Sequence, residues 1–211
     1  LDGTTPTPSS TIYTSPIKVS DNTIIKIATV LPSGKMSRIR TVNVEKQTYA
    51  PAIKIDGVKS GLQMSRVKGN FLKVDDLNWT DAEWEKSIIS NLEQIKIQRK
   101  DDGATLRGAN NYAAIAEGYI NIPEDGVYYL SSRLEQVWID NKLVVNNEGD
   151  VKASTMNDSS VALAKGLHPI KVVFLANIIG GWPSWWSSTA IEMRKDNEKE
   201  FTAVGGSQLF R

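Results

Sequence analysis

Apolar and polar positions alternate every second residue across residues 113–145, which is the clearest pattern in the chain. Ile120 and Ile122 fall on one face of the first predicted strand, and more polar neighbours fall on the other. Residues 123–126 predict a turn, because a proline fixes φ and a glycine tolerates positive φ. A second tight turn is predicted at residues 140–142. The pattern therefore predicts an antiparallel meander of three or four short strands.

Strand-forming residues recur on both sides of this meander. The predicted strands cover residues 12–13, 17–19, 23–28, 38–44, 61–64, 69–74, 92–97, 160–163, 168–176 and 189–193. A turn at residues 31–34 separates two of them. Thr80 and Glu83 have the spacing of a capping box, which predicts a short helical turn over residues 81–86. The predicted fold class is all-β.

A junction between two domains is predicted at residues 45–56. Pro51 disfavours helix at the residue before it, and few apolar residues are in register there. The chain therefore divides into a domain of residues 1–48 and a larger domain of residues 49–211. Apolar residues of the C-terminal tail are expected to pack back onto the second domain. Because the junction is too short to act as a free linker, the two domains are expected to touch.

Composition argues against several classes of function. The 211 residues include 25 Lys and Arg against 24 Asp and Glu, and the net charge of +1 without a basic run argues against nucleic-acid binding. The chain has no cysteine, hence no disulfide and no thiolate metal site. It has no apolar run of about 18 residues, so no membrane insertion is expected. It begins at Leu1 without a methionine, which we interpret as a piece of a longer protein.

The first domain carries an ordered motif in its opening residues. The motif comprises Leu1, Asp2, Gly3, Thr4, Pro6, Thr7, Ser10, Tyr13, Pro16 and Ile17. It resembles the chitobiase/β-hexosaminidase C-terminal domain, which implies a small immunoglobulin-like β-sandwich. That family has one or two strands before the Leu-Asp-Gly turn. The resemblance therefore implies a sandwich truncated at its first hairpin, with a sheet edge that is exposed or paired with a neighbour.

The second domain carries three motifs in order. They are Gly118-Tyr-Ile followed by a Pro-x-Asp-Gly turn, then Trp138-Ile-Asp, then residues 163–173 around the only histidine, His168. Together they resemble the PA14 family over residues 57–194. The resemblance implies a larger antiparallel β-sandwich, of a kind often attached to glycoside hydrolases and adhesins, where it binds or helps position glycans. The family pattern also has a histidine here, so we expect His168 to have a packing role.

Neither catalytic nor metal chemistry is predicted for this chain. Sugar-binding PA14 adhesins hold Ca²⁺ with adjacent aspartates just before the strand that carries Trp-Ile-Asp. Arg133 and Leu134 stand at that place, so two oxygen ligands are lost and a positive charge is added. No pair of carboxylates stands out by motif. The first resemblance implies a parent enzyme whose catalytic Asp-Glu pair lies in a TIM barrel, and the sequence shows no βα repeat. No cofactor is expected.

The predicted glycan-binding residues centre on a tryptophan-rich loop within residues 177–188. Its three indoles cannot all share one strand face, so at least one is expected to be exposed and to stack on a sugar ring. Polar partners are expected from the loop that precedes the Trp-Ile-Asp strand. The predicted site comprises Trp182, Trp185, Trp186, Arg133, Glu135 and Gln136. Two other interpretations remain open: the tryptophans pack against another domain, or they belong to the core.

The sequence therefore predicts a non-catalytic accessory region of a bacterial glycoside hydrolase of the β-N-acetylhexosaminidase type, located in the periplasm, secreted or at the cell surface. It would bind or position glycans that contain N-acetylhexosamine, and its partner would be an upstream catalytic domain of the same chain. The enzyme attribution comes from the resemblance alone. The alternatives are a structural spacer that braces the catalytic barrel, and a cell-surface adhesin module.

Overall fold

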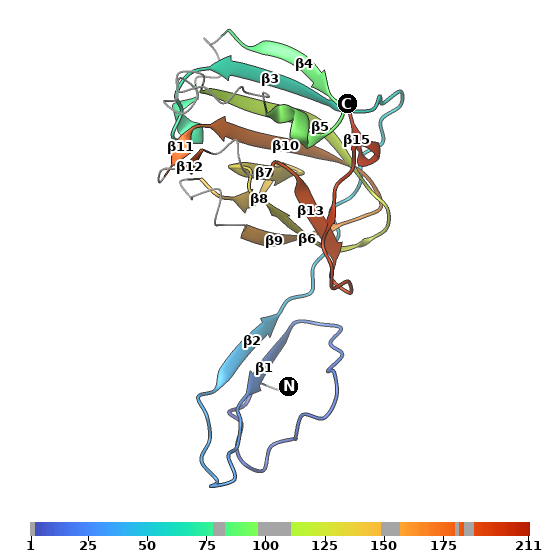
Figure 1. The fold of residues 1–211 in the computed structure, drawn as a ribbon. Helices are drawn as coiled ribbons and strands as arrows, with labels where there is room; N and C mark the ends of the chain where they lie inside the picture. The colour runs from blue at the N-terminus through green and yellow to red at the C-terminus, as the bar shows by residue number, and fades with distance from the viewer. Residues whose placement is uncertain (1–2, 78–82, 97–110, 149–156, 180–181, 184–187) are drawn as a thin grey trace. The chain divides into compact units, whose positions relative to one another are not determined.

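The β-branched residues of the N-terminal part form a single hairpin, in which β1 (Thr23–Ile27) pairs antiparallel with β2 (Arg40–Val44). The computed structural model describes residues 3–77, 83–96, 111–148, 157–179, 182–183 and 188–211 (Figure 1). The hairpin belongs to one compact unit, Leu1–Thr48, and the remaining strands belong to a second unit, Tyr49–Arg211. Each unit is described by itself below.

The first unit confirms two predicted strands and the turn between them. Leu31 N donates to Lys35 O at 2.8 Å, and Gly34 N donates to Leu31 O at 2.8 Å. Gly34 has φ +79°, a conformation that glycine adopts without strain. The strands predicted at residues 12–13 and 17–19 are wrong, because these segments have no strand partner within the described residues of the unit. A β-strand forms only where a neighbour accepts and donates its backbone hydrogen bonds.

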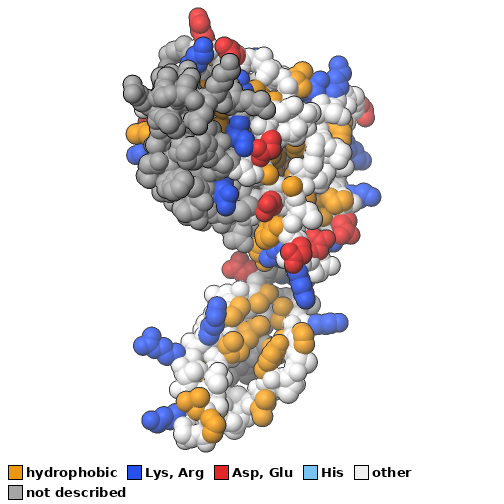
Figure 2. All heavy atoms as spheres, viewed as in Figure 1, with side chains coloured by type: hydrophobic (Ala, Val, Ile, Leu, Met, Phe, Trp, Pro, Cys, Tyr) orange, Lys and Arg blue, Asp and Glu red, His pale blue; other side chains and the backbone are white. Residues whose placement is uncertain are grey.

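Apolar side chains of the first unit remain exposed, and none of its described residues is buried. The side chain of Ile12 is 80% exposed and that of Tyr13 is 68% exposed. Figure 2 shows hydrophobic side chains gathered on the visible face of this unit. The described part of the unit therefore has an apolar surface but no core of its own.

The second unit is a sandwich of two antiparallel sheets. The seven-stranded sheet contains, in order, β4 (Glu85–Ile89), β3 (Leu62–Lys68), β5 (Tyr112–Ile122), β10 (Gly166–Ala176), β7 (Gln136–Ile139) and β8 (Lys142–Asn146), with β15 (Leu209–Phe210) also paired to β5. The four-stranded sheet contains β14 (Thr202–Ala203), β13 (Ile191–Lys195), β6 (Gly126–Ser132) and β9 (Asn157–Leu163). A short hairpin joins β11 (Ile178–Ile179) to β12 (Trp182–Pro183). The all-β fold class is confirmed.

The described residues include no helix with the length and apolar character that a membrane crossing requires.

The core lies between the two sheets and follows the two-residue alternation. Ile120 and Ile122 of β5 are fully buried, as the pattern predicts. They pack in one cluster with side chains from both sheets, including Leu130, Ile139, Ile170, Phe174 and Ile191. Val204 and Leu209 of the tail join the same cluster, which confirms that the tail packs back.

The predicted meander is wrong in its pairing, although its strands exist. β5 and β6 lie in different sheets, and only β7 and β8 form a hairpin. β10 pairs with β5 along its whole length, and β3 and β15 occupy its other edge. Because both edges of β5 are occupied, the turn after Ile122 carries the chain across the sandwich.

Three local predictions in the segment before β5 also need correction. Residues 92–97 were expected to form a strand, but Leu92–Ile95 form the 3₁₀ helix η2. Its apolar residues are three apart and so fall on one buried side, and Gln94 Oε1 accepts bonds from Ser90 N at 2.7 Å and Ser90 Oγ at 3.1 Å. Residues 69–73 are not a strand, and η1 (Val74–Asp76) follows them. Of the predicted helical turn at 81–86, the last two residues belong to β4, whereas residues 81–82 lie outside the described residues.

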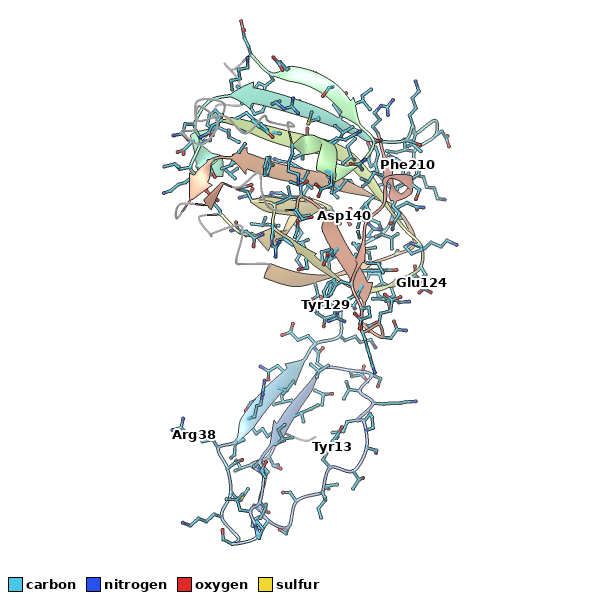
Figure 3. The ribbon with its side chains drawn as sticks, in the orientation of Figure 1. Tyr13, Arg38, Glu124, Tyr129, Asp140 and Phe210 are labelled. Carbon is cyan, nitrogen blue, oxygen red and sulfur yellow. The ribbon has the colours of Figure 1, made fainter. Side chains whose placement is uncertain are left out.

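His168 is fully buried and joins the β7–β8 hairpin to the connection between β9 and β10. Its Nδ1 lies 2.7 Å from Oδ2 of Asp140, which is labelled in Figure 3. Its Nε2 lies 2.8 Å from Ala164 O. Asp140 and Asn141 form the β7–β8 turn with φ of 49° and 61°, which confirms the predicted tight turn. The contacts give the histidine the structural role predicted for it, because they fasten this turn to the connection between β9 and β10.

We expect His168→Ala to lower the free energy of unfolding by about 3 kcal/mol, because it leaves a cavity and removes the partner of a partly buried carboxylate. Chemical denaturation of the whole chain measures this change. Lys142→Ala is the matched control, since Lys142 is an exposed residue next to the same turn. A loss for His168→Ala no larger than that of the control would contradict the anchoring role.

Candidate functional site

The outer face of the seven-stranded sheet is divided into a covered part and an open part. Ile115 of β5 and Val173 of β10 pair across the strands and face away from the main core. They are buried in a second cluster, together with Val74 and Leu77 from the segment that contains η1. That segment covers one end of the outer face, and the other end stays open.

A polar and aromatic row crosses four strands at the open end. The register pairs Gln63 of β3 with Glu117 of β5, Glu117 with Lys171 of β10, and Lys171 with Trp138 of β7. Residues that are directly opposite in neighbouring strands point to the same face of a sheet. The four side chains therefore lie side by side on the outer face.

A second row extends this surface into a groove. Tyr119 and Pro169 pair across β5 and β10, two residues along from Glu117 and Lys171. Asn141 of the β7–β8 turn and Arg211 complete its edges, and the groove has a volume of about 600 Å³. This volume falls in the range of roughly 300–1,000 Å³ that small-molecule sites occupy. The groove combines two aromatic side chains with amide, carboxylate and cationic groups, so it has both stacking surfaces and hydrogen-bonding partners.

Trp138 is held in place by its neighbours. Its Nε1 donates to Gln136 Oε1 at 3.0 Å, and Gln136 Nε2 donates to Glu148 Oε2 at 3.4 Å. The ammonium group of Lys171 lies 5.8 Å from the centroid of the indole ring, close enough for a cation–π contact. The ladder between β7 and β8 also shifts register between Val137 and Trp138. These contacts orient the indole on the open face before any ligand arrives.

The loop that precedes Trp138 has its polar groups turned inward. Glu135 is only 1% exposed, and its Oε2 accepts a bond from Leu175 N at 2.8 Å. Leu134 is fully buried, and Arg133 is half-buried. Asn147 donates through Nδ2 to Leu134 O at 2.8 Å and also to Ser132 O. The loop thus supports the sandwich, and neither Arg133 nor Glu135 lines the groove.

The predicted site residues are therefore not gathered in one place by the described structure. Gln136 meets the groove only through its bond to Trp138. Trp182 begins β12, but its side chain lies outside the described residues, as do Trp185 and Trp186. Sequence reasoning missed Glu117, Lys171 and Arg211 as possible ligand contacts. The alternation of β5 and β10 could have placed the first two on an outward face, but only the strand register brings them together.

The described ranges contain no cluster of three or more metal-ligating side chains. The two carboxylates that flank β7 already have partners, since Glu135 accepts from the backbone of β10 and Asp140 contacts His168. Arg133 and Leu134, which the sequence resemblance aligns with the paired aspartates of sugar-binding PA14 adhesins, are a half-buried cation and a fully buried apolar residue.

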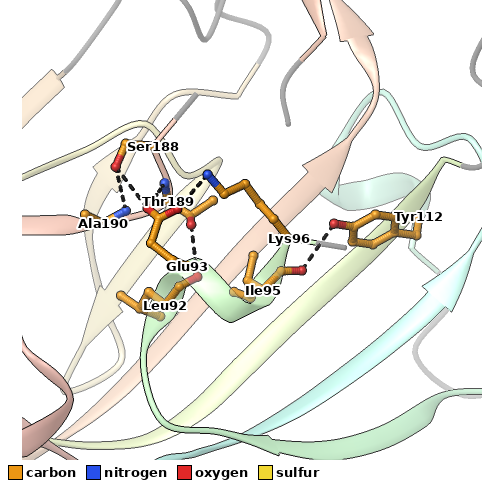
Figure 4. A network of polar contacts seen from close by, with 8 residues as sticks. All are labelled: Leu92, Glu93, Ile95, Lys96, Tyr112, Ser188, Thr189 and Ala190. Atoms are coloured by element: carbon orange, nitrogen blue, oxygen red, sulfur yellow. Dashed lines mark hydrogen bonds and ion pairs between the residues drawn. The ribbon is translucent and has the colours of Figure 1, made fainter. Parts of the chain in front are cut away.

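Glu93 fixes the chain just beyond the tryptophan-rich loop. Its Oε1 accepts from Thr189 N at 2.9 Å and from Ser188 Oγ at 3.1 Å, and its Oε2 lies 2.6 Å from Lys96 Nζ (Figure 4). Thr189 Oγ1 also donates to Leu92 O at 2.9 Å. Partial burial raises the pKa of the Glu93 carboxyl, but its hydrogen bonds and the charge of Lys96 outweigh that effect and hold the pKa below its ordinary value. The network thereby ties the entry of β13 to η2.

We expect Glu93→Gln to reduce stability at pH 7 and to flatten its dependence on pH below about 4. A lowered pKa in the folded state means that the contribution is present above the unfolded-state pKa and lost as pH falls through the folded-state pKa. The side chain is half exposed, so we expect a loss of less than about 1 kcal/mol. Urea denaturation between pH 3 and pH 7 measures it, with Glu85→Gln on exposed β4 as control. Parallel pH curves for Glu93→Gln and the unchanged chain would contradict the assignment.

Comparisons with known proteins agree with both resemblances noted in the sequence. The PA14 domain model matches residues 90–199, and the chitobiase/beta-hexosaminidase C-terminal domain model matches residues 1–41. Over 211 residues, which is 100% of this chain, the chain is 37% identical to a protein of Porphyromonas gingivalis named beta-hexosaminidase. The chain spans 27% of the length of that protein.

Two solved structures share the fold at low sequence identity. An anti-sigma factor domain-containing protein superimposes with a TM-score of 0.51 at 15% identity, over 81% of this chain and 55% of that chain. The PA14 domain of the MpAFP antifreeze protein superimposes with a TM-score of 0.50 at 11% identity, over 78% of this chain and 96% of that chain. These likenesses concern the fold alone, and they confirm the predicted β-sandwich.

Proposed function

This chain belongs to the PA14 domain family, and from that premise we propose that it is a non-catalytic accessory region of a glycoside hydrolase of the β-N-acetylhexosaminidase type. In this proposal the second unit binds glycan and presents it to a catalytic domain of the same protein. The chain spans about a quarter of the length of its curated relative, so the activity of the whole protein is part of the proposal. Such a role implies a location where the enzyme meets glycans: the periplasm, the cell surface or the medium.

The open groove on the seven-stranded sheet is the observation that carries this proposal. Flat aromatic surfaces stack on the apolar faces of sugar rings, and nearby polar groups bond the hydroxyls. Trp138 and Tyr119 provide the aromatic surfaces. Gln63, Glu117 and Asn141 provide amide and carboxylate groups that can bond hydroxyl and N-acetyl groups.

The remaining predicted site residues have different parts in the proposal. The tryptophan-rich loop with Trp182, Trp185 and Trp186 remains a predicted second contact for the glycan. Gln136 orients Trp138 through its hydrogen bond. Glu135 holds β10 through the Leu175 amide, so it supports the groove from within. Arg133 stays a predicted sugar contact.

We expect the tryptophan fluorescence of the whole chain to change saturably on titration with N-acetylglucosamine and its β-linked dimer. Trp138→Ala should weaken binding of the dimer about tenfold, which corresponds to the loss of roughly 1.4 kcal/mol of stacking. Tyr129→Ala is the matched control, because Tyr129 is an aromatic residue of the four-stranded sheet that contacts Arg194 and does not line the groove. Unfolding midpoints of both variants show whether the fold is intact.

Two results would contradict the proposal that the groove binds glycan. No response up to millimolar sugar would leave the glycan-binding role without support. A response that survives Trp138→Ala but disappears in Trp185→Ala or Trp186→Ala would move the site from the groove to the tryptophan-rich loop.

The exposed apolar side chains of the first unit favour a second role, which is to brace the catalytic domain. Large exposed apolar patches mark surfaces that bind other polypeptide. Ile12 and Tyr13 are the most exposed, and Ile24 of β1 and Leu31 of the hairpin loop are each about half exposed. A contact between this unit and an upstream catalytic domain of the same protein would cover such a surface.

We therefore expect limited proteolysis of the chain alone to cleave within residues 1–48 before it cleaves the second unit. Adding the catalytic domain of the same protein should slow cleavage in residues 1–48 at least about tenfold, because a docked surface unfolds less readily. Tyr13→Ser should weaken this protection, and Tyr49→Ser is the control outside the unit. Protection that is absent, or equal in the two variants, would argue against the bracing role.

A further inference from the structure

The charged groups of the groove are unequal in sign. Lys171 and Arg211 provide two cationic side chains, and Glu117 provides the one carboxylate side chain among the lining residues. The formal charge of these side chains is therefore positive, although the side chains of the whole chain are nearly balanced in charge. A glycan that carries a carboxylate matches the groove better in charge than a neutral glycan does.

Lys171 places a positive charge beside the position at which a sugar would stack on the indole of Trp138. It lies in the middle of β10, with Glu117 opposite it on one side and Trp138 opposite it on the other. Its ammonium group is placed over the indole, 5.8 Å from the ring centroid. A carboxylate on a sugar at Trp138 would thus lie within reach of a fixed cation.

Arg211 is fixed on the other side of β5. Its backbone pairs with Lys59 in both directions, with N···O distances of 2.8 and 2.9 Å, and its guanidinium group contacts Ser60 O. A guanidinium group has five N–H donors in a planar fork, and such a fork suits carboxylates. Neighbouring strands are about 4.8 Å apart, so Lys171 and Arg211 flank β5 at a separation of roughly two strand spacings. The two cations therefore bracket the floor of the groove.

We propose that the groove selects a glycan in which an N-acetylhexosamine adjoins a carboxylate-bearing sugar, with the carboxylate at Lys171. This inference rests on the proposed glycan-binding function and specifies its ligand. Trp138 stacks on the acidic sugar, and Arg211 adds a second positive group across β5. Glu117 and Gln63 bond the hydroxyl and N-acetyl groups of the neighbouring sugar. Glu117 also repels a second carboxylate placed at the centre of the groove, so the position of the acidic sugar is defined.

Calorimetric titration of the whole chain with two disaccharides tests the proposal. One is glucuronate linked to N-acetylglucosamine, and the other is the neutral β-linked dimer of N-acetylglucosamine. We expect the acidic disaccharide to bind about tenfold more tightly at low salt, the lower end of what a hydrogen bond to a charged group contributes. The preference should shrink at high salt, because exposed charges are then screened.

Four variants locate the preference. Lys171→Gln should remove most of it, whereas Lys171→Arg, which keeps the positive charge beside the indole, should retain it. Lys142→Gln is the matched control, because it removes the same charge from neighbouring β8 outside the groove. Glu117→Gln should strengthen binding of the acidic disaccharide. Unfolding midpoints equal to that of the unchanged chain show that each variant is folded.

The possible failures are distinguishable. If the neutral dimer binds as tightly as the acidic disaccharide, or if the preference survives Lys171→Gln, the selection for a carboxylate is overturned while the glycan-binding function stands. If neither disaccharide binds, the proposed function fails together with this inference.

Discussion

The pairing of β5 with β10 is the constraint on which the second unit depends. Both strands have eleven residues, and their register runs without interruption from Tyr112 opposite Ala176 to Ile122 opposite Gly166. Every second residue of this ladder enters the core, and the alternate residues form the outer face. A shift of register by one residue would exchange the two faces, so the same hydrogen bonds determine both the stability of the sandwich and the composition of the groove.

One end of the outer face of the seven-stranded sheet is open because the segment that contains η1 covers only the other end. The segment that ends in η1 buries Ile115 and Val173, and it is fastened from two directions. Val74 N donates to Glu148 Oε1 at 3.0 Å, and Asn177 Nδ2 donates to Phe71 O at 2.7 Å. Beyond this cover the outward residues change from aliphatic to polar and aromatic: Ile115 gives way to Glu117, and Val173 gives way to Lys171. The change in residue type along both strands marks the boundary between core and groove.

The sequence predicted the strands of the second unit better than their partners, and the reason is physical. Two-residue alternation reports which residues share a face, as for Ile120 and Ile122, but it does not report which strand lies alongside. The pairing of Glu117 with Lys171 joins residues far apart in the chain and follows from the occupation of both edges of β5. Residues 92–97 have an apolar spacing that suits a strand or a 3₁₀ turn, and the bonds from Ser90 to Gln94 favour the turn. The groove could not be predicted for the same reason, since it consists of cross-strand neighbours.

The contacts of the loop before Trp138 favour the proposed glycan recognition on the face of the sheet over recognition through a bound metal. Glycan recognition through a metal requires carboxylate oxygens that point outward and remain available. Here Leu134 belongs to the core, and Glu135 uses Oε2 to accept the amide of Leu175. Turning Glu135 outward would cost that bond and leave a backbone amide of β10 unsatisfied in the interior. The loop thus stabilises the sandwich, and Gln136, the first residue of β7, holds the indole of Trp138 by a hydrogen bond. A rigid aromatic surface flanked by fixed charges recognises a ligand with little loss of side-chain entropy, which is the physical advantage of placing the proposed site on strands.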